Sequence, residues 1–342
     1  MGATLDRRTA LTGTAALVAL AAVGCSTNSA RSAIQRTTGP TPSSADLIAT
    51  AAPSSPPVTS GSVGSTPSSA TTTPVAPSPT GSSTPSDPAT ARPSATPIAS
   101  RRVDLNADPG AIISRATVPA LTYHQIRDYK SSDSAVDRNY IIPPAAFRMQ
   151  LRAVADAGYS TISPDQYLAH LTTGAALPEK PIMISFDDTD EDGFTIGLPE
   201  LSKYHFTGTY FIMTVAIGKL PHYMTADQIR RLDGTGHTIA AHTWDHHRVD
   251  KYSGKDWQIQ LIRPAEELTK LLKHPIPHFG YPFGVWKPDG FPHLKAAGYQ
   301  TAFQLNEHKM STTSPLYTIR RAIANPKWTR SELLKAVGPS WT

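Results

Sequence analysis

Aromatic residues are confined to the last two thirds of this chain. Tyr123 is the first aromatic residue of the 342-residue sequence, and all twelve histidines lie from His124 onward. A stretch of more than a hundred residues without Phe, Tyr or Trp offers little material for a hydrophobic core. About 220 residues are therefore left to fold, which suits one large domain.

The N-terminus has the pattern of a bacterial export signal. Arg7 and Arg8 precede an apolar segment, residues 10–23, that is too short and too rich in Ala and Gly for a transmembrane helix. The segment ends at AAVGC, where Cys25, the only cysteine of the chain, resembles the lipid-modified residue of a lipobox. We therefore predict a signal peptide over residues 1–25 and a membrane anchor through a lipid on Cys25, with soluble secretion as the alternative.

Residues 26–102 are rich in Pro, Ser, Thr and Ala, with thirteen prolines and few charges. Such a segment cannot bury enough apolar surface to offset its ordering entropy, so we predict a disordered linker. The net charge of +5 is small, and the arginine doublets have no aromatic residues between them. These features argue against a nucleic-acid partner.

Residues 103–342 alternate between short apolar runs and helical segments, and we expect them to form the folded domain. Strands are expected at residues 118–126, 181–186, 208–213, 237–242, 277–284, 299–305 and 317–324. Helices are expected at residues 143–159, 225–236, 291–298 and 330–337, and Thr225 and Gln228 form a capping box at the start of the second. The order predicts an α/β fold, a distorted (β/α) barrel of about seven parallel strands, with catalytic groups at the C-terminal ends of the strands.

The stretch PIMISFDDTDEDGF, residues 181–194, allows three interpretations. From residue 188 the spacing of carboxylates resembles an EF-hand loop, but a strand precedes it and loop position twelve falls on Pro199, so this interpretation fails. The second interpretation is a solvated acidic turn. In the third, Asp187 and Asp188 are a catalytic pair at the end of a barrel strand, and only the carboxylates that follow are solvated.

A second constellation is AAHTWDHH, residues 240–247. His242 ends an expected strand, His246 follows four positions later, and His247 is the alternative to it. Two imidazoles and one carboxylate are the protein ligands of an open, hydrolytic metal site. A lone His would be an ordinary core or surface residue, but two at this spacing, matched by Asp187 and Asp188 on another strand, favour a metal centre.

Three motifs in order resemble the polysaccharide deacetylases, the NodB-homology domain of carbohydrate esterase family 4. SFDDT resembles the family's T-F-D-D-G, HTWDH resembles H-(S/T)-x-x-H, and GYPFG at residues 280–284 resembles R-x-P-(F/Y). The resemblance covers about residues 117–342 and is nearest to the branch that acts on poly-N-acetylglucosamine. It implies an acetylated polysaccharide as substrate.

By this resemblance Asp188, His242 and His246 would bind one divalent metal ion, zinc in the first place, with Co²⁺ or Ni²⁺ as alternatives. Asp187 would be the general base that activates water, and the backbone N–H of Tyr281 would contribute to the oxyanion site. Four residues near the motifs are expected to contact substrate: Trp244, Pro282, Phe283 and Trp286.

The chain departs from the family pattern at three places. Thr189 replaces the Gly after the Asp pair, and Gly280 stands where the family commonly has an Arg that orients the base. The family's last motif often supplies a His as general acid, whereas the corresponding strand here offers Arg321, which cannot donate a proton near neutral pH. The general acid is therefore unassigned, with His124 and His308 as candidates.

The sequence thus predicts a monomeric, exported, lipid-anchored enzyme that removes N-acetyl groups from a cell-wall or exopolysaccharide polymer containing N-acetylglucosamine. An O-acetyl esterase that uses the same site and a catalytically weak carbohydrate-binding domain are the alternatives. A glycosidase does not fit, because it needs two carboxylates that face each other across a sugar.

Overall fold

The computed structural model describes residues 103–305, 308–339 and 341 of the chain. The predicted signal peptide, the lipid anchor at Cys25 and the predicted linker lie outside the described residues, and the domain boundaries stay predictions. No helix within the described ranges is both long enough and apolar enough to cross a membrane.

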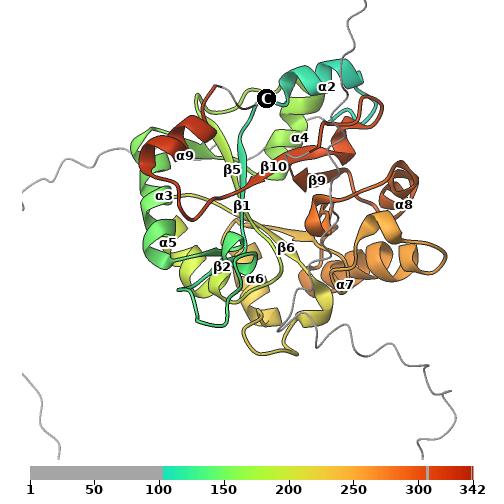
Figure 1. Cartoon of the computed structure of the whole chain (residues 1–342). Helices are drawn as coiled ribbons and strands as arrows, with labels where there is room; N and C mark the ends of the chain where they lie inside the picture. Colours follow the sequence, from blue (N-terminus) through green and yellow to red (C-terminus); the bar gives the residue numbers. More distant parts are fainter. Residues whose placement is uncertain (1–102, 306–307, 340, 342) are drawn as a thin grey trace, which may run out of the picture. The chain divides into compact units, whose positions relative to one another are not determined.

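Within the described residues, seven parallel strands close into a barrel (Figure 1). They are β1 (Ala120–Tyr123), β5 (Pro181–Phe186), β6 (Thr209–Ile212), β7 (Thr238–Ala241), β8 (His278–Gly280), β9 (Thr301–Leu305) and β10 (Ile319–Ile323). β1 pairs with both β5 and β10, which closes the ring. The prediction of an α/β barrel of about seven parallel strands is confirmed.

The barrel strands correspond to continuous runs of apolar residues, and not to segments in which apolar and polar residues alternate. β5 is buried at every position after Pro181, as expected for a parallel strand that has the barrel interior on one side and helices on the other. The strand expected at residues 118–126 is shorter than predicted, because the chain leaves the barrel after Tyr123. Its second part, β2 (Gln125–Ile126), pairs instead with β3 (Ile141–Ile142) in a separate small sheet, and β4 (Ser160–Thr161) extends the barrel sheet beside β5.

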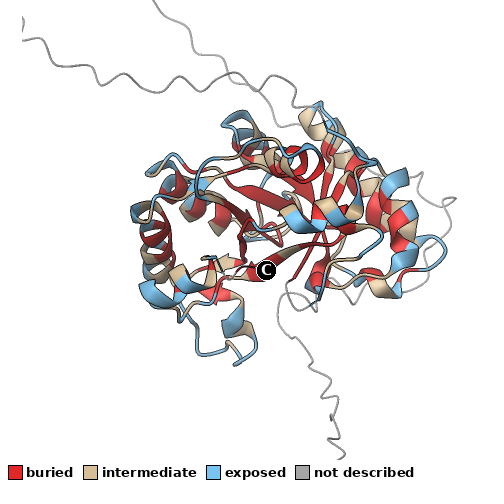
Figure 2. Cartoon of the chain, turned by 90° about the horizontal axis from the view of Figure 1, so that it is seen from above, coloured by how far each residue is buried: buried red, intermediate tan, exposed pale blue. Residues whose placement is uncertain are grey.

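Helices surround the barrel, and their outer faces are exposed while the strands at the centre are buried (Figure 2). They are α2 (Pro109–Arg115), α3 (Pro144–Asp156), α4 (Pro164–Thr173), α5 (Leu198–Ser202), α6 (Ala226–Gly234), α7 (Arg263–Leu272), α8 (Phe291–Ala296) and α9 (Arg330–Ala336). The capping box predicted at Thr225 and Gln228 starts α6, and both of its hydrogen bonds form.

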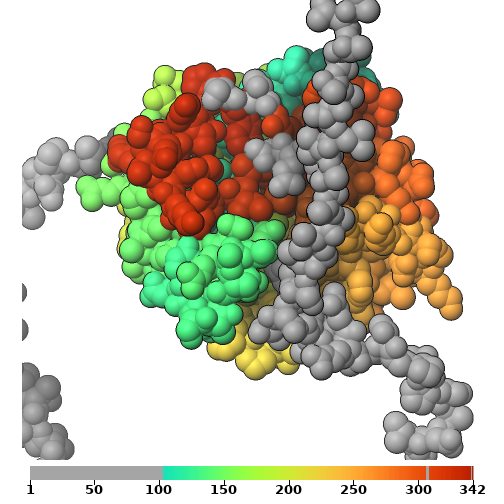
Figure 3. Space-filling model, in the orientation of Figure 1, coloured from blue at the N-terminus to red at the C-terminus, as the bar shows by residue number. Residues whose placement is uncertain are grey.

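The last part of the chain packs against the first part of the domain. α9 contacts α3, and β10 lies beside β1. In the space-filling view the C-terminal segment, in red, accordingly lies against residues drawn in green (Figure 3). This closure leaves only β1 between β10 and β5, the strand that precedes the acidic motif.

Candidate active site

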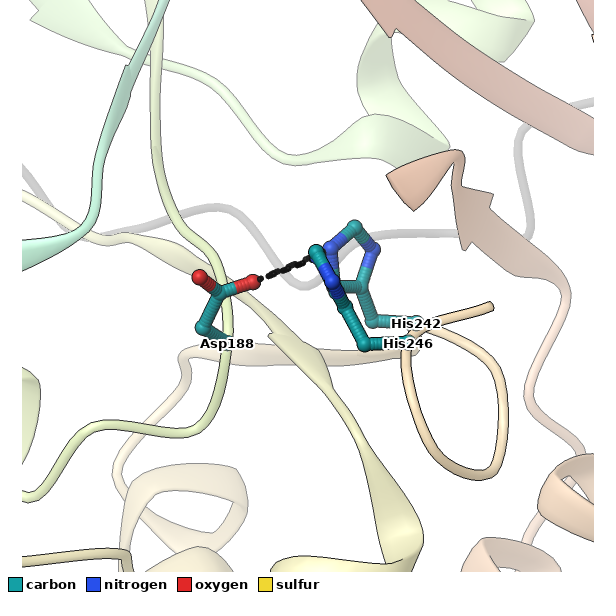
Figure 4. A group of neighbouring side chains, drawn as sticks. All are labelled: Asp188, His242 and His246. Carbon is teal, nitrogen blue, oxygen red and sulfur yellow. Dashed lines mark ion pairs between the residues drawn. The ribbon is translucent and has the colours of Figure 1, made fainter. Parts of the chain in front are cut away.

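Three side chains from two strand ends converge at one rim of the barrel (Figure 4). Asp188 lies two residues beyond β5, His242 directly follows β7, and His246 lies in the loop after it. The Nε2 atoms of His242 and His246 are 3.4 and 3.0 Å from Oδ1 of Asp188. One ligand atom from each residue lies within 4.8 Å of the other two, which is the spacing of donors around a single ion.

The orientation of His242 fits a metal ligand. Its Nδ1 is 2.7 Å from the backbone oxygen of Gly280, and because a carbonyl only accepts, Nδ1 carries the proton. In the neutral ring, Nε2 then presents a lone pair toward an acidic oxygen of Asp188. A cation between the two atoms resolves this opposition, and a ligating His commonly donates its other N–H to a carbonyl.

Backbone conformation also shapes the site. Asp188 and Thr189 have φ of 68° and 70°, and Thr243 and His246 have φ of 67° and 69°. This left-handed region costs about 1 kcal/mol or more for a residue with a Cβ. Two hydroxyls offset the cost: Thr189 Oγ1 accepts from the Met213 N–H at 2.7 Å, and Thr243 Oγ1 accepts from the His246 N–H at 2.9 Å. The Thr189 contact shows how a threonine stands where the family has glycine.

Asp187 is buried beside the three converging side chains, with Oδ2 4.0 Å from His242 Nε2. Arg321, which is fully buried, binds both carboxylate oxygens, and Thr122 donates to Oδ1 at 2.9 Å. Burial alone would raise the pKa of Asp187, but the positive charge of Arg321 and its hydrogen bonds to the carboxylate oppose this and help to hold the pKa below its ordinary value. Thr122 was not foreseen, since one Thr in an apolar strand carries no signal.

His124 lies at the same rim. It is mostly buried, and its ring meets Tyr140 edge-on with centroids 5.1 Å apart. A narrow cavity of about 10 Å³ opens here, close to the room that one water molecule needs. The residues that line it include His124, Tyr140, Asp187, His242, His246 and Phe283. The arrangement places the Asp187 carboxylate, the His124 imidazole and two of the three potential ligands, His242 and His246, around one small volume.

Comparison with known proteins agrees with this geometry. Residues 174–302 match the family described as polysaccharide deacetylase. This part of the chain is therefore similar to a polysaccharide deacetylase domain. A relative from Staphylococcus aureus (strain MRSA252), named poly-beta-1,6-N-acetyl-D-glucosamine N-deacetylase, is 26% identical over 225 residues, which span 60% of this chain and 77% of the relative.

Two solved structures share the deacetylase fold. The Streptococcus pyogenes deacetylase PplD, solved in complex with acetate, has a TM-score of 0.60 at 22% identity and covers 65% of this chain and 98% of its own. IcaB from Ammonifex degensii has a TM-score of 0.51 at 20% identity and covers 61% of this chain and 92% of its own. The shared barrel therefore extends over most of the described residues.

His247, the expected alternative to His246 as a ligand, is bound to Asp245. Its Nδ1 lies 2.5 Å from Asp245 Oδ1, and the side chain is half exposed. Asp245 also accepts from the Gln260 side chain at 2.7 Å, so it orients His247 rather than a ligand. Of the two adjacent histidines, only His246 reaches Asp188.

The backbone N–H of Tyr281 is already in use. It donates to the Phe303 oxygen at 3.0 Å and continues the pairing of β8 with β9. An N–H held in a strand ladder is not free to stabilise an oxyanion, so the oxyanion role expected for Tyr281 does not fit this geometry. Sequence spacing could not show this, because it does not reveal where β8 stops pairing.

Of the four expected substrate contacts, only Phe283 lies in the cavity. It is exposed, and its ring packs edge-on against His246 with centroids 4.6 Å apart. Pro282 is buried beside it. The Trp286 indole donates to Gln304, and Trp244 lies under the Arg263 guanidinium, 4.5 Å from the ring centroid. The two tryptophans therefore contact β9 and α7, and neither lines the narrow cavity.

A second, larger cavity of about 470 Å³ adjoins the site through Asp188 and Tyr140. Its lining includes Asp190, Glu191 and Asp192, which the sequence suggested as a solvated loop edge. These residues are half-buried, and burial raises the pKa of Asp192 to about 6. His308, the other candidate acid, is exposed and lines neither cavity.

Proposed function

We propose that this protein is a metal-dependent hydrolase that removes N-acetyl groups from a cell-wall or exopolysaccharide polymer containing N-acetylglucosamine. The observation that carries the proposal is the convergence of Asp188, His242 and His246 beside the buried carboxylate of Asp187. The name of the Staphylococcus aureus relative supports a β-1,6-linked polymer.

Asp188 and the Nε2 atoms of His242 and His246 would hold the metal ion. Two imidazoles and one carboxylate suit Zn²⁺ first, and the same donors accept Co²⁺ and Ni²⁺. A bound ion would polarise the acetyl carbonyl and lower the pKa of a coordinated water. The Gly280 carbonyl keeps His242 in the tautomer that this binding requires.

Asp187 would act as the general base. Its Oδ2 faces the ligand cluster and would take the proton from the attacking water, while Arg321 balances the negative charge. The carbonyl carbon gains the water oxygen, the C–N bond breaks, and the products are acetate and a free amine.

His124 would donate the proton to the departing nitrogen. It shares the narrow cavity with Asp187 and with Phe283, whose exposed ring would contact the sugar. The Nε2 atoms of His242 and His246 face Asp188, whereas His124 lines the narrow cavity beside Asp187, and this position supports its role as the acid.

We also propose that the enzyme works as a monomer outside the cytoplasm. The support for its place outside the cytoplasm is in the sequence alone: the apolar segment of residues 10–23, the predicted lipobox at Cys25, and the predicted Pro-rich linker that would let the domain reach a polymer above the membrane.

The test is acetate release from N-acetylglucosamine oligomers by the full chain, with O-acetylated oligomers of equal length assayed in parallel. We expect release from the N-acetylated oligomers and a 10²- to 10⁴-fold loss of kcat in Asp187→Asn. Release from the O-acetylated set alone would replace the proposal with the esterase. Saturable binding without release from either set would replace it with the carbohydrate-binding domain.

A further inference from the structure

The carboxylate of Asp187 is held by an arginine from the far end of the chain. Arg321 lies in β10 and has no exposed surface. Its Nη1 donates to Oδ1 of Asp187 at 2.6 Å, and its Nη2 donates to Oδ2 at 3.0 Å. A bidentate pair of this kind fixes the plane of the carboxylate as well as its charge. Burying two charges carries a large desolvation cost, so the pair calls for a reason beyond stability.

The two oxygens of Asp187 are not equivalent. Oδ1 accepts from Arg321 and also from the Thr122 hydroxyl at 2.9 Å, whereas Oδ2 accepts from Arg321. Oδ2 is also the oxygen that lies 4.0 Å from His242 Nε2. An ionised carboxylate oxygen has two lone pairs, so Oδ2 keeps one for the site while Oδ1 is saturated.

Closure of the barrel creates this arrangement. Thr122 of β1 is in register with Ser185 of β5 on one side and with Ile323 of β10 on the other. Arg321 reaches both hydroxyls from β10, with Nη1 3.2 Å from Thr122 Oγ1 and 3.2 Å from Ser185 Oγ. Arg321 and Thr122 both bind Asp187, and we call these two residues the clamp. Three neighbouring strands, β1, β5 and β10, thus fix their positions.

The position of Gly280 belongs to the same arrangement. A Cβ at Gly280 would lie 2.7 Å from Cδ1 of Phe211, far inside van der Waals contact. The Phe211 ring cannot move away freely, because it is fully buried and lies under the Arg321 guanidinium, 4.4 Å from Cζ to the ring centroid. A side chain at position 280 and an arginine seated on Phe211 therefore exclude each other.

We propose that Arg321 and Thr122 are positioning residues, which hold Asp187 with Oδ2 presented to the ligand cluster, and that Gly280 is required because Phe211 supports Arg321. The inference rests on the proposed function, since it concerns the orientation of the base. Arg321 acts through Asp187 and donates no proton itself.

The test is a double-mutant cycle in the full chain, with a fully N-acetylated β-1,6-linked glucosamine oligomer as substrate. Arg321→Met should lower kcat about 100-fold with KM within threefold, because a base displaced by about 1 Å loses that much. The kcat of Arg321→Lys should lie between that of the wild type and that of Arg321→Met, since one ammonium can reach only part of the carboxylate. In an Asp187→Asn background, Arg321→Met should change kcat less than threefold, because the catalytic carboxylate that Arg321 orients is gone.

Two further measurements separate positioning from folding. Asp187→Asn/Arg321→Met removes both buried charges, so its melting temperature should match or exceed that of Arg321→Met alone. Zinc bound per chain should stay at the wild-type value in all three Arg321 variants. Arg320→Met is the matched control. It removes a guanidinium from the preceding position of β10, on the opposite face of the strand, and should leave kcat unchanged.

The outcomes distinguish the clamp from the proposed function. If the wild type is active and the kcat of Arg321→Met lies within threefold of the wild-type value, the role proposed for the clamp is overturned and the proposed function stands. An equal loss from Arg321→Met with and without Asp187 also overturns it, because the arginine would then act elsewhere. A wild type that loads zinc but releases no acetate overturns the proposed function, and with it the role given to the clamp.

Discussion

Gly280→Ala should damage the site by crowding rather than by lost chemistry. The added Cβ would lie 2.7 and 3.0 Å from Cδ1 and Cγ of Phe211 and 3.2 Å from Nδ1 of His242. Phe211 packs against Phe303 on one side, with centroids 5.6 Å apart, and against Arg321 on the other. The ring is fully buried and also lies near His242, so its displacement would disturb both Arg321 and His242.

The expected cost follows from these contacts. One extra methyl group in a filled core lowers the free energy of unfolding by about 1–3 kcal/mol. Because Phe211 is confined, we expect a value near the middle of this range, about 2 kcal/mol. For a domain of this size, that corresponds to a decrease in Tm of roughly 4–8 °C. Zinc affinity should fall about 10-fold or more, because His242 loses its alignment with the Gly280 carbonyl.

Urea unfolding and zinc competition titrations would measure the two effects. Gly234→Ala is the matched control: this glycine ends α6, and a Cβ there would meet nothing within 4 Å, so no loss is expected. A Gly280→Ala protein within 0.5 kcal/mol of wild type, with unchanged zinc affinity, would refute the reasoning that Phe211 is confined.

Three further predictions concern single side chains. His246→Ala should lower zinc affinity more than 100-fold in a competition titration, while His247→Ala should change it less than twofold, because His247 binds Asp245 instead. Phe283→Ala should raise KM about 3- to 10-fold with kcat nearly constant, as expected for a lost aromatic contact to substrate. Burial lowers the pKa of His237 to about 4, and its Nδ1 accepts from the Gly208 N–H. The folded protein then binds this proton less readily than the unfolded chain, so His237 should contribute fully above pH 6.5, and up to about 3 kcal/mol should be lost as the pH falls to 4. His237→Gln should flatten that part of the pH dependence of the urea midpoint.

The ligand cluster was visible in the sequence because it depends on strand ends. Asp188 and His242 follow apolar runs, and the C-terminal ends of parallel strands share one rim, so their proximity followed from the fold class. The choice between His246 and His247 was not visible. It depends on the left-handed backbone at His246 and on the bond from Asp245 to His247, and spacing does not reveal either.

The sequence offers Arg321 as a possible catalytic residue, but its contact with Asp187 could not be predicted, for a related reason. Arg321 and Asp187 are 134 positions apart, and only closure of the ring through β1 brings β10 near β5. Gly280 looked like a missing arginine, whereas the structure shows a position with no room for a side chain. The pairing of the Tyr281 N–H with Phe303 could not be predicted, because the extent of strand pairing is set by β9, which lies about twenty residues later in the chain.

The most direct test of the central claim is a zinc titration of the metal-free full chain, followed by acetate release from an N-acetylated β-1,6-linked glucosamine oligomer. The account predicts that activity rises linearly and stops at one zinc per chain, and that Asp188→Asn never reaches this plateau. Undiminished acetate release by the metal-free protein would contradict it.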